Sequence, residues 1–125
     1  MKMTVLPSAY VHHSAFFNYM TEDEKQLNVK RIEDKAAIVV GYEENEYVKF
    51  AAIIDLDCPD RIHVREVCGH FVKKIGMLEI FATALARVMK KSFLSFNTEK
   101  DGVEWIGANM GFAPDEKGEF VKRVA

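Results

Sequence analysis

Hydrophobic and polar residues follow one another along this chain in patterns that predict six strands and three helices. The most regular section lies in the middle, where two apolar runs rich in β-branched residues flank the polar stretch "EENE" at residues 43–46. Such a pair of runs predicts a hairpin of two antiparallel strands. The second run ends at "DCPD", because Pro59 has no amide hydrogen to donate to a neighbouring strand.

A third strand follows the hairpin directly. In "RIHVREVCGHF", residues 61–71, the apolar Ile62 and Val64 alternate with polar residues. Alternation with a period of two is typical of a strand with one buried face. Gly69 near the end of this stretch indicates a bulge or a place where another backbone comes close. The chain therefore predicts a meander of three antiparallel strands.

The clearest helix is predicted from about Met77 to Lys91. Apolar residues recur there at i, i+3, i+7 and i+10 and give the helix one hydrophobic face: Leu78, Phe81, Leu85 and Val88. Glu79 near the start and two lysines in the last turn suit the dipole of such a helix. A helix with one apolar face is expected to pack on the sheet.

The N-terminal part of the chain gives weaker patterns. "MTVL", residues 3–6, reads as a short strand that ends before Pro7. Apolar residues then predict a helix from Ser8, its candidate cap, to about Gln26. Within this region the charged stretch "TEDEK", residues 21–25, has the composition of a solvated turn or a helix end.

After the long helix the chain returns to short elements. "SFLSF" (92–96) predicts a strand, "GVEWIGANM" (102–110) a short helix that stops at Gly111, and "GEFVKRV" (118–124) a final strand. Helices alternate with strands and must cover a mixed sheet. The order of elements predicts an α/β (α+β layered) fold in a single domain spanning residues 1–125.

Composition and charge narrow the classes of function. The chain has 125 residues, of which 49% are hydrophobic and 29% charged, which excludes a disordered or collagen-like protein. The net charge is −2, so the chain as a whole has no drive toward nucleic acid or an acidic membrane. We therefore expect no nucleic-acid and no membrane partner, and any anion site must be local.

Cysteines and histidines carry no recognisable motif. Cys58 and Cys68 lack the CxxC spacing and are expected to be reduced core residues rather than a disulfide or a nucleophile. The four histidines lack metal-site spacings such as HExxH, so no metal is expected. The chain begins with no signal-like segment and contains no apolar run of ~18 residues. A cytoplasmic protein is the simplest interpretation.

Three segments in series give the chain a family resemblance: "GMLEIFATALARVMKK", "FLSFNTE" and "GVEWIGANMGF". Together with the order of elements they resemble the GNAT superfamily of acyltransferases, most closely in residues 61–112, where "NMGF" is similar to the family's Leu-Gly-Phe ending. The short chain and weak motifs look most like small bacteriophage-encoded members. The resemblance implies a mixed, mostly antiparallel sheet with helices on both faces, two strands splayed beside the long helix, and acylation of an amine by acetyl-CoA.

The resemblance also implies where acetyl-CoA would bind. The pantetheine arm would lie between the splayed strands and the pyrophosphate on the amides at the start of the long helix. The matching positions here are Val67, Cys68, Phe71, Lys73, Lys74, Gly76, Met77 and Asn97. Phe71 stands where the family has Arg or Gln, and Lys74 where it has a glycine. Lys73 and Lys74 would compensate as point charges, or would simply form a solvated turn.

Catalytic residues are harder to assign. Family members place a tyrosine, which protonates the leaving thiolate, four residues before the Gly of Gly-Phe, and that position here is Gly107. Bound water or Cys68 would have to replace it. Acyl transfer to an amine also needs a base. We favour Glu66, with His70 second. His63 lies three residues from Glu66 and is expected on the opposite face of the strand.

Two functional hypotheses remain open at this stage. The chain is either an active N-acetyltransferase for a small-molecule or protein amine, or a GNAT-like fold that has lost turnover and serves as a binding or structural module, as in a phage particle. Glu66 would then only pair with Arg65 or a lysine on the surface. Acidic stretches and lysine clusters on opposite sides would favour a cationic acceptor. A monomer and a homodimer are both compatible with the sequence.

Overall fold

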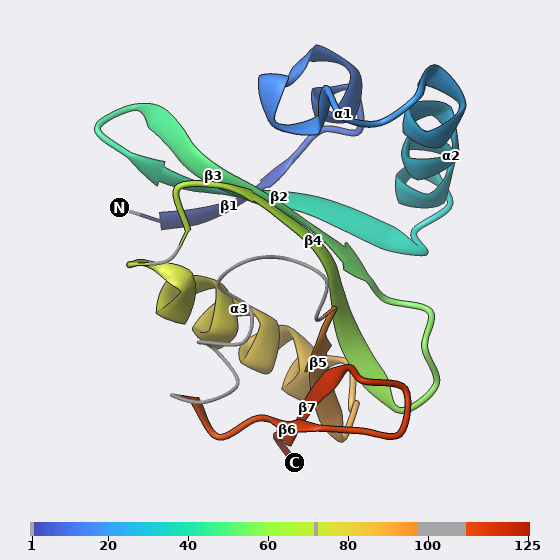
Figure 1. Cartoon of the computed structure of the whole chain (residues 1–125), viewed down its shortest axis with the longest axis vertical. Helices are drawn as coiled ribbons and strands as arrows, with labels where there is room; N and C mark the ends of the chain where they lie inside the picture. The colour runs from blue at the N-terminus through green and yellow to red at the C-terminus, as the bar shows by residue number, and fades with distance from the viewer. Residues whose placement is uncertain (1, 72, 98–109) are drawn as a thin grey trace.

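A single mixed sheet organises the computed structural model, which describes residues 2–71, 73–97 and 110–125 (Figure 1). Within this part of the chain the strand order is β1-β2-β3-β4-β5-β7-β6. All neighbours are antiparallel except β4 and β5. The strands are β1 Lys2–Leu6, β2 Ala37–Glu44, β3 Tyr47–Asp55, β4 Arg61–Gly69, β5 Phe93–Phe96, β6 Ala113–Pro114 and β7 Phe120–Arg123. The predicted mixed, mostly antiparallel sheet is confirmed; β6, only two residues long, carries no pattern that predicts it.

Helices cover both faces of this sheet, as predicted. The helix α1 (Tyr10–His13), the 3₁₀ helix η1 (Ala15–Phe17) and the helix α2 (Glu22–Glu33) lie on one face. The helix α3 (Ile75–Val88) lies on the other (Figure 1). In the part of the chain that the structure describes, no helix has the length and apolar composition needed to cross a membrane.

The continuous helix predicted from Ser8 to Gln26 is wrong. The chain breaks at Ser14, which has extended backbone and accepts a hydrogen bond from the Phe16 amide at 3.1 Å. A new helix starts at Thr21: its hydroxyl accepts from the Glu24 amide at 3.2 Å, and the Glu24 carboxylate accepts from the Thr21 amide at 3.0 Å. This reciprocal pair is a capping box, so "TEDE" begins α2.

The two faces of the sheet bury different cores. On the α3 face, the helix contributes Ile75, Leu78, Ala82 and Ala86, all nearly or fully buried. Val88, predicted on that face, is 80% exposed, so the predicted apolar stripe is wrong at its C-terminal end. The opposite face has a smaller core, which includes Val11, Phe17 and Cys68. Two small alanines on the buried side of α3 let the helix lie close to the sheet.

Strand β4 has two distinct halves. From Arg61 to Val64 it pairs with β3 on one edge and with β5 on the other. Its register with β3 then shifts: Ile54 faces Val64 and Ile53 faces Glu66, so Arg65 is an extra, bulged residue. The last contact with β5 is the Asn97 amide, which donates to the Val64 carbonyl at 3.1 Å. Among the described residues, the second half of β4 pairs only with β3, and the residues that would continue β5 beside it lie outside the described part of the chain.

Candidate functional site

The end of β4 and the start of α3 enclose a cavity of about 420 Å³, lined by Gly69, His70, Phe71 and Lys73. Gly69 has φ of +104°, and a Cβ there would lie 2.7 Å from the Lys49 carbonyl oxygen. Only glycine therefore fits, and the predicted close backbone approach is confirmed. The His70 amide then donates to the Lys49 carbonyl at 3.0 Å. These contacts fix the end of β4 where the chain turns toward α3.

The start of α3 has the features of an anion site. Lys74 is its N-cap residue and has no side-chain capping bond, while Lys73 and Lys74 are both exposed. Gly76 lies in the first turn, where, among the described residues, an added Cβ would meet the Met110 Cε atom at an ordinary 3.7 Å. Packing against these residues therefore does not require a glycine there. The dipole of α3 and the two lysines favour a negatively charged group at this point.

Glu66 faces a second cavity of about 480 Å³ on the α2 side of the sheet. The Tyr19 hydroxyl donates a hydrogen bond to Glu66 Oε2 at 2.7 Å, and the Cys68 thiol donates to the Tyr19 oxygen at 3.6 Å. Partial burial, followed by the hydrogen bonds to Glu66 and Cys68, raises the pKa of Tyr19 far above its usual value of 10. The Tyr19 phenol therefore keeps its proton at neutral pH.

His63 and Glu66 lie on the same face of the sheet, so the prediction that they face opposite ways is wrong. Ile62, Val64 and Val67 all pack in the core beneath α3. The bulge at Arg65 inserts one residue between these inward positions, and both Arg65 and Glu66 therefore point toward α2. The spacing rule fails because it assumes a regular strand.

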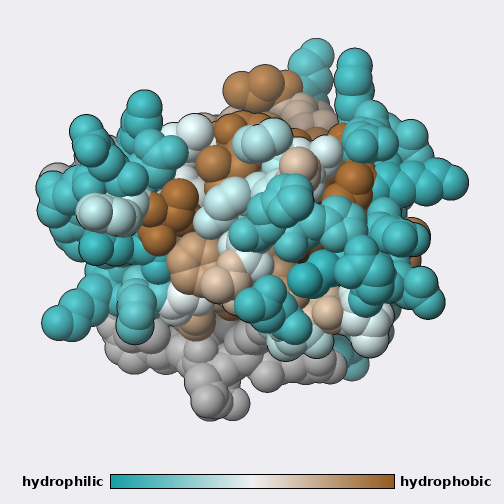
Figure 2. Space-filling view, turned by 90° about the horizontal axis from the view of Figure 1, so that it is seen from above, coloured by the Kyte–Doolittle hydropathy of each residue, from teal (hydrophilic) through white to brown (hydrophobic). Residues whose placement is uncertain are grey.

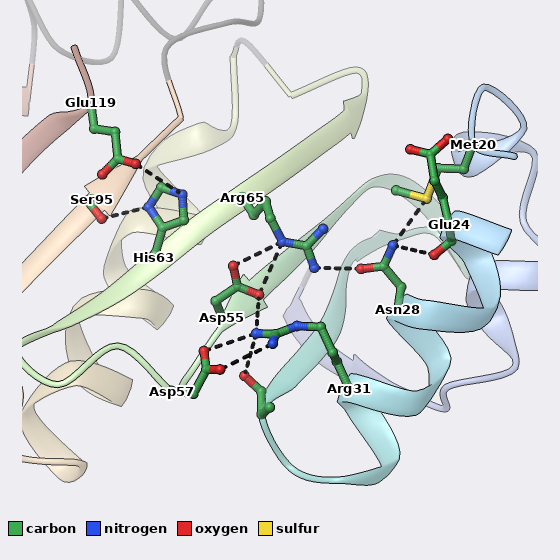
Figure 3. A network of polar contacts seen from close by, with 11 residues as sticks. Met20, Glu24, Asn28, Arg31, Asp55, Asp57, His63, Arg65, Ser95 and Glu119 are labelled. Carbon is green, nitrogen blue, oxygen red and sulfur yellow. Dashed lines mark hydrogen bonds and ion pairs between the residues drawn. The ribbon is translucent and has the colours of Figure 1, made fainter. Parts of the chain in front are cut away.

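A charged network holds α2 against the sheet beside this cavity (Figure 3). The Arg65 Nε atom donates to both oxygens of Asp55 at 3.0 and 3.2 Å, and its Nη2 atom donates to Asn28 Oδ1 at 2.5 Å. Arg31 on α2 donates to Asp55 at 3.1 Å and to Asp57 at 3.0 Å. Asn28 and Arg31 belong to α2, whereas their partners belong to β3 (Asp55), β4 (Arg65) and the segment after β3 (Asp57). The network therefore fixes the position of α2 on the sheet.

The walls of the larger cavity carry an excess of negative charge. They are formed by Met20, Glu24, Leu27, Asn28, Arg31, Asp55, Asp57, Arg65 and Glu66. Four carboxylates against two guanidinium groups leave a difference of two negative charges. Hydrogen bonds from Arg31 lower the pKa of Asp57, and the Thr21 amide lowers that of Glu24, so both stay ionised. Viewed from the α1 and α2 side, hydrophilic residues flank smaller hydrophobic patches (Figure 2).

A second polar cluster joins β4, β5 and β7 on the same face (Figure 3). His63 Nδ1 and the Ser95 hydroxyl are hydrogen-bonded at 2.7 Å, and His63 Nε2 lies 4.0 Å from Glu119. Burial lowers the pKa of His63, although the charge of Glu119 opposes this shift. Ser95 is fully buried and cannot attack a substrate from solvent. This cluster therefore holds the closed half of β4 to its neighbours.

The predicted site residues lie around the open half of β4, Glu66–Gly69, which among the described residues pairs with β3 alone. Glu66 faces the acidic cavity, and His70, Phe71 and Lys73 line the cavity at α3. Val67 packs in the core beneath α3, and Cys68 on the opposite face. Lys74, Gly76 and Met77 form the start of α3, and Asn97 ends the contact with β5. Gly107, the position of the family's general acid, lies outside the described residues.

Sequence reasoning missed Tyr19 and the partners of Arg65. Tyr19 lies 47 residues from Glu66, and no local pattern connects the two. The His12 imidazole lies 3.2 Å from the Glu22 carboxylate. Within residues 2–71, 73–97 and 110–125, no three histidine, cysteine, aspartate or glutamate side chains are grouped as a metal site would require.

Several solved structures share this fold. A protein from Desulfovibrio desulfuricans assigned to the GNAT family of acetyltransferases is 9% identical, with a TM-score of 0.66 over 98% of each chain. A chain of the AtaT–AtaR complex bound to DNA is also 9% identical, with a TM-score of 0.67 over 99% of this chain and 95% of that one. AtaTR bound with acetyl-CoA matches at 9% identity and a TM-score of 0.59, covering 98% and 92%.

The comparisons establish the fold and correct one expectation. No family model and no curated protein matches the sequence. The chain nevertheless has the GNAT fold that its sequence resembles. A structure of this fold bound to DNA in the AtaT–AtaR complex overturns the exclusion of nucleic acid, which the net charge was taken to support. A whole-chain charge near zero does not exclude such a partner, because another subunit or a local patch can make the contact.

Proposed function

We propose that this chain, which has the GNAT fold, is an acetyl-CoA-dependent N-acetyltransferase with Glu66 as its general base. One observation carries the proposal: the open half of β4 ends beside the N-terminus of α3, where Lys73 and Lys74 are exposed. An extended, anionic ligand could pair with the backbone N–H and C=O groups of β4 and place its negative charge at the N-terminus of α3, the positive end of the helix dipole. Acetyl-CoA has both of these features.

The residues at the open edge fit the parts of acetyl-CoA. Val67 and Cys68 would present their backbone to the pantetheine arm, and the amides at Gly76 and Met77 would receive the pyrophosphate with help from Lys73 and Lys74. The buried Phe71 would close the cavity at α3 behind the arm. Bound acetyl-CoA supplies the acetyl group as a thioester that an amine can attack.

Glu66 is placed to prepare the amine for this attack. Amines are protonated at neutral pH and become nucleophilic only after they lose a proton to a base. The carboxylate of Glu66 faces a cavity whose walls carry two more negative than positive charges, which attracts a cationic acceptor. His70 is exposed and lines the other cavity, so it is a less suitable base for an amine held beside α2.

A second candidate is a binding module without turnover. It is favoured by Phe71 and Lys74, which replace the Arg/Gln and glycine of the family's pyrophosphate loop and leave fewer small residues for a phosphate to approach. In this case the open edge of β4 would bind another protein or a different ligand without chemistry. Turnover separates the two candidates.

The test measures thiol release from acetyl-CoA by the purified protein with butylamine, 1,4-diaminobutane or a peptide with a free N-terminal alanine. We expect release with at least one amine, and a 10²–10⁴-fold lower rate in Glu66→Gln, since general-base catalysis contributes roughly that much. Glu33→Gln, at the exposed end of α2, is the matched control and should keep the wild-type rate. Release no faster than the blank with every amine would favour the binding module.

A further inference from the structure

The Tyr19 hydroxyl connects two residues of β4 that belong to different parts of the site. It donates to Glu66 at 2.7 Å and accepts from the Cys68 thiol at 3.6 Å. Residues two apart on a strand are about 6.6 Å apart along its axis. Glu66 faces the acidic cavity, whereas Cys68 directly precedes the residues that line the cavity at α3. The hydroxyl therefore contacts both Glu66, in the wall of the acidic cavity, and the residue that precedes the lining of the cavity at α3.

The chain holds Tyr19 in this place by local structure on both sides. Before it, the Met20 amide donates to the Phe17 carbonyl at 3.0 Å, and Phe17 is fully buried. After it, the capping box of Thr21 and Glu24 fixes the start of α2. The residue as a whole is 53% exposed, and its hydroxyl is held by Glu66 and Cys68. A half-exposed phenol that is anchored in this way can meet a substrate.

From this geometry we infer that Tyr19 and Glu66 form a proton relay that carries a proton from the acceptor amine to the leaving sulfur. The inference rests on the proposed function and assigns the general acid that the family resemblance leaves without a residue. Tyr19 would be the group that touches the sulfur, and Glu66 the group that touches the nitrogen. Cys68 would orient the hydroxyl through its thiol and would take no part in the transfer.

One proton leaves through solvent, and the relay returns to its starting state. The ammonium group gives one proton to the Glu66 carboxylate, and its nitrogen attacks the thioester carbon to form the C–N bond. A second N–H proton passes to solvent. As the C–S bond breaks, its electron pair leaves with sulfur, which takes the proton of the Tyr19 hydroxyl. Glu66 then returns its proton to the Tyr19 oxygen, so the products are the amide, the thiol and one proton in solvent.

The raised pKa of Tyr19 makes its hydroxyl a weak acid on its own. Burial raises this pKa first, and the hydrogen bonds to Glu66 and Cys68 raise it further, so the phenol is neutral at neutral pH. A neutral phenol cannot act as the first base. It can give up its proton only when another group supplies a new one. Glu66 Oε2 lies 2.7 Å from the hydroxyl oxygen and is close enough to supply it.

The experiment uses Tyr19→Phe, with acetyl-CoA and 1,4-diaminobutane as substrates and thiol release as the signal. We expect a loss of about 100-fold or more in kcat, the lower range for loss of an acid or base. Acetyl-CoA affinity measured by calorimetry should stay within about twofold. Added imidazole buffer at constant pH should raise the rate of Tyr19→Phe as its concentration increases, because an external acid can replace the phenol, while wild type should not respond.

A control variant sharpens the result. Tyr47→Phe removes the hydroxyl of a tyrosine that is 70% exposed on the hairpin, and it should keep the wild-type rate. A wild-type rate in Tyr19→Phe overturns the relay while leaving the proposed function intact. A lower rate with no response to imidazole reduces Tyr19 to a structural contact. Absence of turnover in wild type removes both the proposed function and the relay.

Discussion

The two halves of β4 share one strand and one partner but have different surroundings. Arg61–Val64 pairs with β5 along its length and with β3 at His63 and Val64, and the part-buried His63–Ser95 contact adds to the pairing. Glu66–Gly69 keeps β3 as its partner and has no second strand among the described residues. The closed half is built for stability, and the open half carries Glu66 and ends beside the start of α3.

The bulge at Arg65 separates the two halves. It shifts the register with β3 by one residue, and it turns Glu66 toward α2 instead of the core. The Arg65 side chain is anchored to Asp55 and Asn28, so the irregular backbone is fixed by charge-assisted hydrogen bonds. The comparison teaches that one irregular residue separates the half of β4 that has two neighbouring strands from the half that, among the described residues, has one; the function that we propose uses the second half as its ligand site.

The largest expected effect on stability lies in the closed half. Ile62 is fully buried, and Ile62→Ala should lower the free energy of unfolding by about 3 kcal/mol, because it removes methylene groups and leaves a cavity. Cys68→Ala in the open half should cost about 1 kcal/mol, since it removes a single sulfur atom. Urea denaturation measures both. An equal cost would contradict the expectation that Ile62→Ala leaves the larger cavity.

Removal of the anchor of the bulge should have the next largest effect. Arg65→Ala leaves Asp55, whose side chain is only 11% exposed, with Arg31 as its remaining ion-pair partner. We expect a loss of about 2 kcal/mol in the free energy of unfolding, below the range for a fully buried pair because Arg65 is partly exposed. Arg65→Lys keeps the charge but not the forked geometry and should recover less than half of the loss.

The Arg65 variants also test whether the bulge positions the base. If it does, Arg65→Ala should lower thiol release well below the wild-type rate at a temperature where the variant is still folded. Circular dichroism at the assay temperature provides the control for folding. A folded Arg65→Ala with the wild-type rate would show that the orientation of Glu66 does not depend on the anchor.

The smallest expected effect is a pH dependence from the closed half. Burial lowers the pKa of His63 below its usual value of 6.5, so the unfolded chain binds a proton more readily than the folded one. The contribution of His63 to stability is therefore present above about pH 6.5 and is lost as pH falls from there through its folded pKa. Urea titrations from pH 8 to pH 5 should show a shallower decline in His63→Gln than in wild type.

An exposed histidine gives the matched control for this titration. His13 is exposed at the end of α1, and His13→Gln should follow the wild-type curve. The lowered pKa values of Asp57, Asp60 and Asp115 also reduce stability toward acid, but they do so in all three proteins. A decline in His63→Gln as steep as in wild type would contradict the buried, neutral state of His63.

Hydrophobic periodicity predicted the main elements because it reflects local structure. The hairpin strands, β4, α3 and β5 lie where the apolar patterns predict them, within a few residues. The helix predicted over Ser8–Gln26 failed because α1 and η1 bury Val11 and Phe17 on one side, which imitates a continuous apolar face. The capping-box pattern "TEDE" at Thr21–Glu24 was the local signal for a new helix.

The site was only partly predictable because its geometry depends on pairing between distant segments. The expected cofactor positions rest on the order of elements and on "FVKKIGM", and they stay a prediction. The bulge at Arg65 depends on the register with β3, which no periodicity in β4 reveals. The Tyr19–Glu66 contact depends on how the segment between η1 and α2 crosses the sheet. The single-strand spacing rule therefore misplaced His63 relative to Glu66.

Acetyl-CoA binding by isothermal titration calorimetry tests the central claim most directly. We predict a micromolar dissociation constant, about −8 kcal/mol, that is lost in Lys73→Glu/Lys74→Glu. The charge-matched variant Lys30→Glu/Lys117→Glu, with exposed lysines on α2 and the β6–β7 turn, should bind as wild type does. No binding at millimolar acetyl-CoA, or equal binding in both double variants, would contradict a cofactor site at the open end of β4.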